Sequence, residues 1–158
     1  MGRQFSRGGN PGAERKEVVM QLILDSSVFV AALRKDEKSY PEALRLFQQI
    51  KDGKHIAIEP YSVLVEVVAA IRRRTNSNLL ANRVKNDFLN IGSLVFVDID
   101  STIAEKAADL AADIGVRGMD AIVIQVAREY NAPMVSMDME MVEKAKQVVE
   151  IKGLNDFV

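Results

Sequence analysis

Four carboxylates lie among apolar residues, where a charged side chain needs a physical reason. They are Asp25, Glu66, Asp120 and Asp138. If the fold gathers them, they repel one another unless a divalent cation binds, and carboxylate oxygen is the ligand that hard ions such as Mg²⁺ and Mn²⁺ prefer. The pattern therefore favours a metal site built from carboxylates.

Two of these acids come after apolar runs that are typical of buried strands. Asp25 follows "LIL" at residues 22–24, and Asp138 ends the segment "PMVSMD". Open α/β sheets bind ligands at the carboxyl ends of their strands, so both positions are suited to function. Each also has a structural explanation, because an aspartate at such a place is a good helix cap. Glu140 competes with Asp138 for any role here.

The other two acids fall within apolar helical stretches. Glu66 is the only charged residue within positions 61–71, and its neighbours at helical spacing are small or apolar. We expect it to lie against packed surface with a cation close by, because an unpaired buried carboxylate is costly. Asp120 is the only charge within 119–127. Its structural explanation is a carboxylate favoured by the helix dipole.

The composition limits the available chemistry. The 158 residues include no cysteine and one histidine, His55. This composition excludes cysteine nucleophiles and most zinc sites, and it leaves His55 as the one candidate base for a serine triad. Hydrophobic residues make up 48% and charged residues 27%, as in globular proteins. With no signal-peptide pattern and no apolar run of spanning length, we expect a cytoplasmic protein without a membrane partner. A net charge of -1 predicts that any nucleic-acid binding is local or metal-assisted.

Short apolar runs alternate with longer amphipathic stretches, a pattern typical of βαβ units. We therefore predict an α/β fold with a five-stranded parallel sheet flanked by helices in three layers. The predicted strands cover residues 18–24, 55–58, 94–99, 133–137 and 147–151. The predicted helices cover residues 27–34, 41–53, 61–74, 78–92, 102–115 and 119–131, with a short helix beginning near Asp138.

The first 17 residues differ from the rest of the chain. They contain four of the nine glycines, few large apolar side chains and a net charge of +2. We predict that residues 1–17 form a flexible basic arm and that residues 18–158 form a single domain. A basic arm suits contact with RNA or a partner, but a solvated tail is the simpler interpretation.

The order of the acids resembles the PIN domain family of metal-dependent ribonucleases, over about residues 20–152. The segment "LILDSSVFVAAL" is similar to the family's opening strand with its metal-binding aspartate, and "VLVEVVAAIRRR" to the helix that carries its glutamate. "RGMDAIVIQVAREYNAPMVSMD" resembles the segment that supplies the third and fourth acids. The compact chain looks like the VapC toxins of bacteria and archaea.

The resemblance implies a role for each motif residue. Catalytic and metal-binding roles are implied for Asp25, Glu66, Asp120 and Asp138, with one or two Mg²⁺ or Mn²⁺ ions as cofactor. Ser26 and Ser136 are implied to support the acids through hydrogen bonds. The expected activity is metal-dependent endoribonuclease cleavage of RNA, and an antitoxin partner and a homodimer are expected from the family.

Several cations are candidates for RNA contact. Arg72 and Arg73 follow the helix of Glu66 and suit an RNA backbone or an acidic antitoxin segment, but cations also complement the dipole at a solvated helix end. Arg117 precedes Asp120 and is a better candidate for binding phosphate or pairing with the acids. His55, at the start of a predicted strand, is expected to be structural.

Other classes fit the sequence less well. A phosphatase of the haloacid dehalogenase type needs Asp-x-Asp after its first strand, whereas this chain has two serines after Asp25. The P-loop and G-x-G-x-x-G patterns of nucleotide-binding proteins are absent. The remaining alternative is a non-catalytic PIN-like module that binds RNA or protein. The presence of all four acids favours the enzyme, because a degenerate site is expected to have lost at least one.

Overall fold

The computed structural model describes residues 18–157, and four of their segments form one parallel sheet. The strands are β1 (Gln21–Leu24), β2 (Ile56–Pro60), β3 (Leu94–Val97) and β4 (Met134–Val135), in the order β3-β2-β1-β4. Every pairing is parallel, which confirms the predicted α/β class. The arm predicted for residues 1–17 lies outside the described residues.

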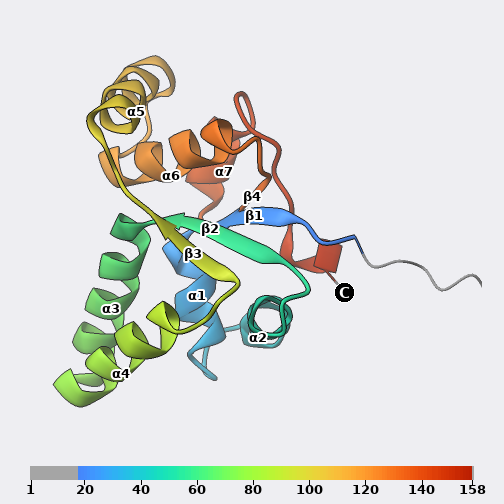
Figure 1. Ribbon diagram of the computed structural model, residues 1–158, viewed down its shortest axis with the longest axis vertical. Coiled ribbons are helices and arrows are strands. Elements are labelled where there is room, and N and C mark those ends of the chain that lie inside the picture. The colour runs from blue at the N-terminus through green and yellow to red at the C-terminus, as the bar shows by residue number, and fades with distance from the viewer. Residues whose placement is uncertain (1–17, 158) are drawn as a thin grey trace, which may run out of the picture.

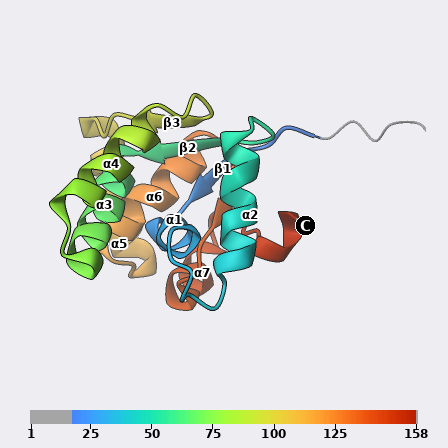
Figure 2. The same cartoon turned by 90° about the horizontal axis from the view of Figure 1, so that it is seen from below.

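Helices connect successive strands and cover the sheet. Figure 1 shows α1–α4 on one side of the strands and α5–α7 on the other, and Figures 1 and 2 both show α1 between α2 and α3. In the described part of the chain, no helix is long and apolar enough to cross a bilayer. The helices are α1 (Ser26–Ala32), α2 (Tyr40–Lys51), α3 (Tyr61–Thr75), α4 (Asn78–Leu89), α5 (Ser101–Ile114), α6 (Gly118–Glu129) and α7 (Met139–Ala145), followed by a 3₁₀ turn, η1 (Leu154–Phe157).

The strand order brings the carboxyl ends of β1 and β4 together. The chain moves outward from β1 to β2 and β3, and it then returns to place β4 on the other side of β1. Ligands bind to open parallel sheets at such a reversal of direction. Asp25 directly follows β1 and Asp138 follows β4, so the fold places two of the candidate acids at this point.

An aromatic cluster holds α1 in place. The ring of Phe29 in α1 lies 5.8 Å from that of Phe47 in α2 and 5.3 Å from that of Phe88 in α4, measured between centroids. All three side chains are buried. Because α1 begins directly after Asp25, this packing also sets the position of that aspartate.

The prediction of a fifth strand at residues 147–151 is wrong. After α7 the amides of Val148 and Val149 both donate to the carbonyl of Ala145, so this segment forms a turn and those amides are not available to a strand neighbour. A single parallel bridge between Ile151 and Met134 is what pairs this segment with the sheet. The other predicted elements are present with shifted ends, and β2 extends past its predicted end at residue 58 to Pro60.

The end of α5 is fixed by a glycine. Gly115 has a φ of +71°, a conformation that costs little for glycine, and its amide donates to the carbonyl of Ala111 at 2.9 Å. The carbonyl of Gly115 accepts a hydrogen bond of 2.9 Å from Nζ of Lys144 in α7. These contacts tie the end of α5 to α7 beside the start of α6.

Candidate carboxylate site

The structure brings three of the candidate carboxylates within electrostatic reach of the fourth, Asp120. Burial raises the pKa of Asp120 from 3.8 to about 6, and the negative charges of Asp25, Asp138 and Glu66 contribute to the increase. The guanidinium of Arg117 lowers the same pKa. Three acids from other elements, and the cation Arg117, therefore act on the carboxyl of Asp120.

Asp25 is the most buried of the four, with 6% of its surface exposed. It occupies the N-cap position of α1, but its side chain makes no capping hydrogen bond. Instead, its Oδ2 accepts hydrogen bonds from Ser27 Oγ at 2.8 Å and Ser136 Oγ at 3.1 Å. The nearby hydroxyl that binds Asp25 is thus that of Ser27 and not that of Ser26, which the family resemblance implied. The carboxylate of Asp25 is therefore held by serine hydroxyls and does not cap the helix.

The same two serines join the loops after β1 and β4. Ser136 Oγ accepts a hydrogen bond of 3.0 Å from the amide of Asp138. Ser27 Oγ accepts one of 3.2 Å from the amide of Met137. Each hydroxyl therefore donates to Asp25 and accepts from the loop that carries Asp138, and this network sets the spacing of the two acids.

Asp138 caps the N-terminus of α7, which is the structural role expected for an aspartate at this position. Its Oδ1 accepts hydrogen bonds from the amides of Glu140 at 3.1 Å and Met141 at 3.2 Å. Its Oδ2 makes no hydrogen bond with residues 18–157 and is available for a second role. Glu140 is exposed, and its Oε1 lies 3.3 Å from Nζ of Lys144. Asp138, rather than Glu140, is thus the acid fixed beside Asp25.

A small pocket opens beside these acids. Its volume of about 30 Å³ has room for an ion or one or two waters, and a nucleotide is far too large for it. Lys144 was missed in the sequence, although its position four residues after Glu140 places both on one helix face. The charged side chains that line the pocket are Arg117, Asp120, Asp138, Glu140 and Lys144.

Glu66 is partly buried on α3, as its apolar neighbours indicated. It forms no ion pair with a lysine or arginine among residues 18–157, so the cation expected beside it is not supplied by a side chain of that region. This leaves the charge of Glu66 to be balanced by another group.

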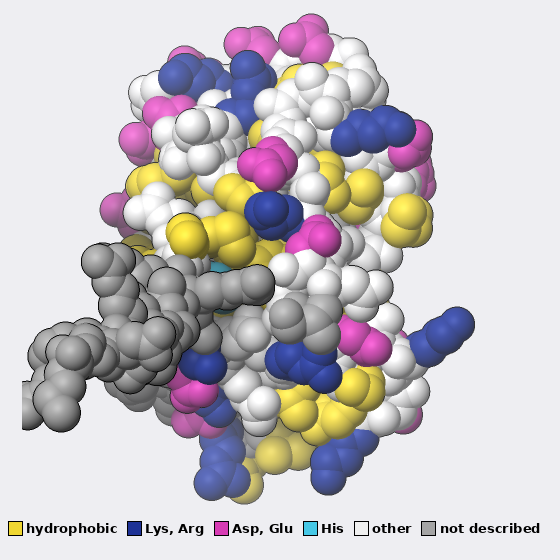
Figure 3. Space-filling view, turned by 90° about the vertical axis from the view of Figure 1, so that its right-hand side faces the viewer, with side chains coloured by type: hydrophobic (Ala, Val, Ile, Leu, Met, Phe, Trp, Pro, Cys, Tyr) yellow, Lys and Arg dark blue, Asp and Glu magenta, His cyan; other side chains and the backbone are white. Residues whose placement is uncertain are grey.

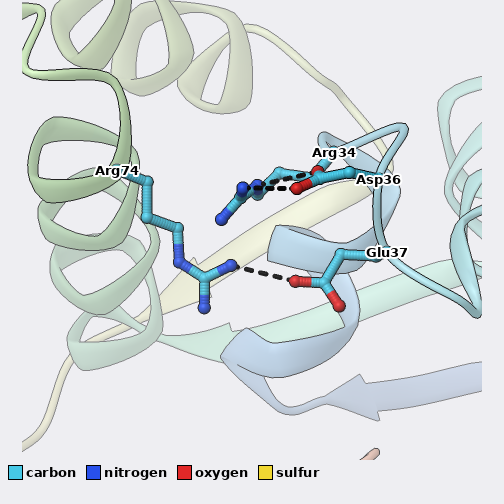
Figure 4. Close-up of polar contacts among 4 residues, drawn as sticks. All are labelled: Arg34, Asp36, Glu37 and Arg74. Carbon is cyan, nitrogen blue, oxygen red and sulfur yellow. Dashed lines mark hydrogen bonds and ion pairs between the residues drawn. The ribbon is translucent and has the colours of Figure 1, made fainter.

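The arginines at the end of α3 lie away from the acids. Arg72 is six residues beyond Glu66, or about 9 Å along the helix axis. It is exposed and donates from Nη1 to Oδ1 of Asn76 at 2.6 Å. Arg74 pairs with Glu37 at 2.9 Å, beside the pair of Arg34 with Asp36 (Figure 4). This end of α3 contacts the loop after α1.

The donor set fits a hard divalent cation in its chemistry. All four groups are carboxylates, and the mutual repulsion felt by Asp120 is what a cation relieves. In the described part of the chain, no three acid or imidazole groups are arranged to hold a metal ion. Ligation by three of these acids therefore requires rotation of their side chains.

A fifth acid, Glu59, was missed in the sequence. It lies at the end of β2, is fully buried and accepts a hydrogen bond from the amide of Leu24. The sequence signal was present, because Glu59 directly follows the apolar run at 56–58, as Asp25 follows the apolar run at 22–24. With the strand predicted to end at residue 58 and the next helix to begin at residue 61, Glu59 lay outside the predicted elements.

Comparison with known families identifies the family to which the fold belongs. A family model described as PIN domain matches residues 22–147, which is well over half of the chain and includes all four acids. The chain belongs to the PIN domain family. No match to this PIN domain was found among the curated protein sequences.

Solved structures share the fold of this PIN domain at low sequence identity. VapC20 of Mycobacterium tuberculosis, a toxin that cleaves the sarcin-ricin loop, is 17% identical with a TM-score of 0.68, covering 83% of this chain and 98% of its own. VapBC2 of Rickettsia felis, bound to a promoter DNA fragment, is 17% identical with a TM-score of 0.60 and coverages of 85% and 98%. DNA-bound VapBC of Salmonella typhimurium is 13% identical with a TM-score of 0.62 and coverages of 86% and 99%.

The surface of this PIN domain carries mixed charge on the face shown in Figure 3. Lysine and arginine side chains are interspersed with aspartate and glutamate there, and they do not gather into a broad basic area. This agrees with the net charge of -1. Any affinity of this face for a polyanion therefore depends on local groups.

The position of Asp120 predicts an unusual pH dependence of stability in the absence of metal. Its folded pKa of about 6 lies above the unfolded value of 3.8, so its stabilising protonation is complete below 3.8 and is lost as the pH rises through 6. Since the group is half-exposed, the loss is roughly 1 kcal/mol, or about 2–4 °C in Tm. Asp120→Asn should have the higher Tm at pH 7.5 in EDTA, measured by thermal unfolding.

The control is Asp87→Asn, which removes an exposed carboxylate from α4. It should follow the wild-type dependence on pH. Millimolar Mg²⁺ should raise the Tm of the wild type more than that of Asp120→Asn, because only the wild type has the full set of carboxylates. A Tm that falls in the same way between pH 4 and 6 in wild type and Asp120→Asn contradicts the prediction.

Proposed function

We propose that this PIN domain is a metal-dependent endoribonuclease that hydrolyses phosphodiester bonds of RNA at Asp25, Glu66, Asp120 and Asp138. The observation that carries the proposal is the convergence of the four carboxylates: Ser136 joins Asp25 to the loop of Asp138, and the charges of Asp25, Glu66 and Asp138 all act on Asp120. Clustered carboxylates are expensive to maintain, and none of the four forms an ion pair with a lysine or arginine among residues 18–157. Carboxylates are also the groups that hard-metal phosphoryl chemistry requires.

The chain's own residues would hold the cation and orient the RNA. Asp25 and Asp120 would bind it directly, while Glu66 and Asp138 would bind it or position water. A bound Mg²⁺ or Mn²⁺ supplies Lewis acidity at the phosphate and an activated water. Ser27 and Ser136 keep the carboxylate of Asp25 in one orientation through their hydrogen bonds to Oδ2.

Arg117 is the cation best placed to contact the scissile phosphate. It lines the small pocket together with Asp120 and lowers the pKa of that acid, so its charge acts within the site. A guanidinium suits a phosphate because it donates two parallel hydrogen bonds. Arg72 and Arg73 would contact RNA at a more distant point, since they lie at the exposed end of α3.

A toxin of a toxin–antitoxin pair is the biological role that the similarities favour. The solved structures that share the fold include a toxin that cleaves the sarcin-ricin loop and two VapBC assemblies bound to DNA. By this reasoning the partners are an RNA substrate, an antitoxin protein and a second copy of the chain. The alternative is a PIN-like module that binds RNA or protein without cleaving it.

An RNA cleavage assay with and without metal separates the two functions. We expect cleavage in Mg²⁺ or Mn²⁺, its loss in EDTA, and its return when metal is added in excess. The alternative module would shift RNA in a gel but leave its length unchanged in every condition. Cleavage that persists in EDTA would show that a contaminant or a metal-independent activity is responsible.

A further inference from the structure

Glu59 is a fully buried acid that the proposed catalytic roles do not use. It lies in β2 with none of its surface exposed. Its Oε1 accepts a hydrogen bond of 2.6 Å from the amide of Leu24, and its Oε2 has no hydrogen-bond partner among residues 18–157. A buried acid in the centre of a sheet is costly, so its position calls for a reason.

The side chain of Glu59 takes the place of a main-chain hydrogen bond in the sheet. Pairing of β1 with β2 ends at Leu22 and Ala57, although both strands continue further. The amides of Ile23 and Asp25 donate to the carbonyls of Pro133, directly before β4, and Val135 in β4. The amide between them, that of Leu24, therefore faces β2. It donates to the Glu59 carboxyl, which therefore sits between the two strands where they separate.

The location of this contact connects it to the proposed site. Leu24 is the last residue of β1 and directly precedes Asp25. On one side, the amide of Asp25 donates to the carbonyl of Val135 at 2.9 Å. On the other side, Glu59 supplies the acceptor for the amide of Leu24. The backbone that carries Asp25 is thus fixed from both neighbouring strands.

The electrostatic surroundings show which property of Glu59 matters. Burial raises the pKa of Glu59 well above its usual range, the amide of Leu24 lowers it, and the charge of Asp25 raises it. The carboxyl therefore stays neutral over a wider pH range than an exposed glutamate. Its contribution at Leu24 is that of a neutral acceptor, which a glutamine can also provide.

We propose that Glu59 is a positioning residue for the carboxylate site, which holds the Leu24–Asp25 backbone through its hydrogen bond to the amide of Leu24. The inference rests on the proposed ribonuclease function. Groups that orient metal ligands change affinity or activity by about 10–100-fold when they are removed. The loss on removing Glu59 should therefore appear in metal binding as well as in cleavage.

A pair of variants of equal length tests this role. Glu59→Gln keeps an acceptor oxygen, and it should bind Mn²⁺ and cleave RNA within about threefold of wild type. Glu59→Met fills similar space without that acceptor, and it should lose about 10-fold or more in both. Hydrogen exchange of the Leu24 amide, followed by NMR, should remain slow in Glu59→Gln and become fast in Glu59→Met.

Ile50→Val, a buried substitution in α2, is the control for lower stability without a change at Leu24. Should Glu59→Met not fold, Glu59→Asp replaces it, because its carboxyl is one methylene shorter and should show the same losses. Wild-type Mn²⁺ affinity in the folded variant that lacks the contact would overturn the role. So would losses in Glu59→Gln as large as those in Glu59→Met. A wild type that cleaves no RNA refutes the ribonuclease, while Mn²⁺ affinity and amide exchange still decide the role of Glu59.

Discussion

Asp25→Asn should lower the rate of RNA cleavage by about 10³-fold in saturating Mg²⁺ or Mn²⁺. The substitution removes the negative charge at the most buried of the four acids. It changes the shape of the side chain little, and the amide oxygen can still accept hydrogen bonds from Ser27 and Ser136. The loss therefore reflects the charge of Asp25 rather than a change in the fold.

The measurement is single-turnover cleavage of a labelled RNA by wild type and variant at equal concentration. Asp52→Asn is the control. Asp52 is an exposed residue at the C-terminal end of α2, in the connection to β2. This variant should cleave at the wild-type rate. If Asp25→Asn cleaves RNA at the wild-type rate and has the wild-type Tm, Asp25 is not part of the catalytic site.

Phe29→Ala should lower the free energy of unfolding by about 3–5 kcal/mol. Phe29 is almost completely buried and contacts the rings of Phe47 and Phe88, so its removal leaves a cavity among α1, α2 and α4. The two neighbouring rings, from α2 and α4, cannot collapse fully into that space. Since the free energy of unfolding of a domain is typically about 5–15 kcal/mol, this single substitution removes a large part of the stability.

Urea unfolding measures the change in free energy directly. Phe96→Ala is the matched comparison, because Phe96 on β3 is only partly buried and stacks on Tyr61 with ring centroids 5.4 Å apart. It should cost less than half as much as Phe29→Ala. A cost below about 1 kcal/mol for Phe29→Ala would show that the aromatic cluster does not hold α1 as the packing indicates.

The positions of the acids could be predicted because they follow from local patterns. Apolar runs identified β1 and β4, and the carboxyl ends of parallel strands lie at one edge of a sheet. Asp25 and Asp138 were placed there on those grounds. The order of the strands is not a local property, however, and only the structure shows that β4 pairs with β1. That pairing brings Ser136 to Asp25.

Two site details depend on geometry that the sequence does not reveal. Successive residues on a helix point about 100° apart, so whether Ser26 or Ser27 reaches Asp25 depends on where α1 begins. The structure places Ser27 against the carboxylate. For Glu59, the missing information was the register, because pairing of β1 and β2 stops at Leu22 and Ala57.

The predicted fifth strand shows a further limit of local patterns. Residues 147–151, "QVVEI", contain three β-branched apolar side chains, which are typical of strands. The short helix α7 ends at Ala145, and the carbonyl of that residue accepts the amides of Val148 and Val149. A turn closed by those bonds prevents a strand from starting there. The local preference for a strand was overridden by the end of the preceding helix.

The most direct test of a metal-dependent hydrolytic site is the chemistry of the RNA ends that the wild type produces. Attack by water forms a new bond to phosphorus and breaks the bond to the 3′ oxygen, leaving a 5′-phosphate and a 3′-hydroxyl. We predict these ends in Mg²⁺ or Mn²⁺ and no product in EDTA. Ends bearing a 2′,3′-cyclic phosphate, which result from attack by the ribose 2′-hydroxyl, or equal cleavage in EDTA would contradict the proposed function.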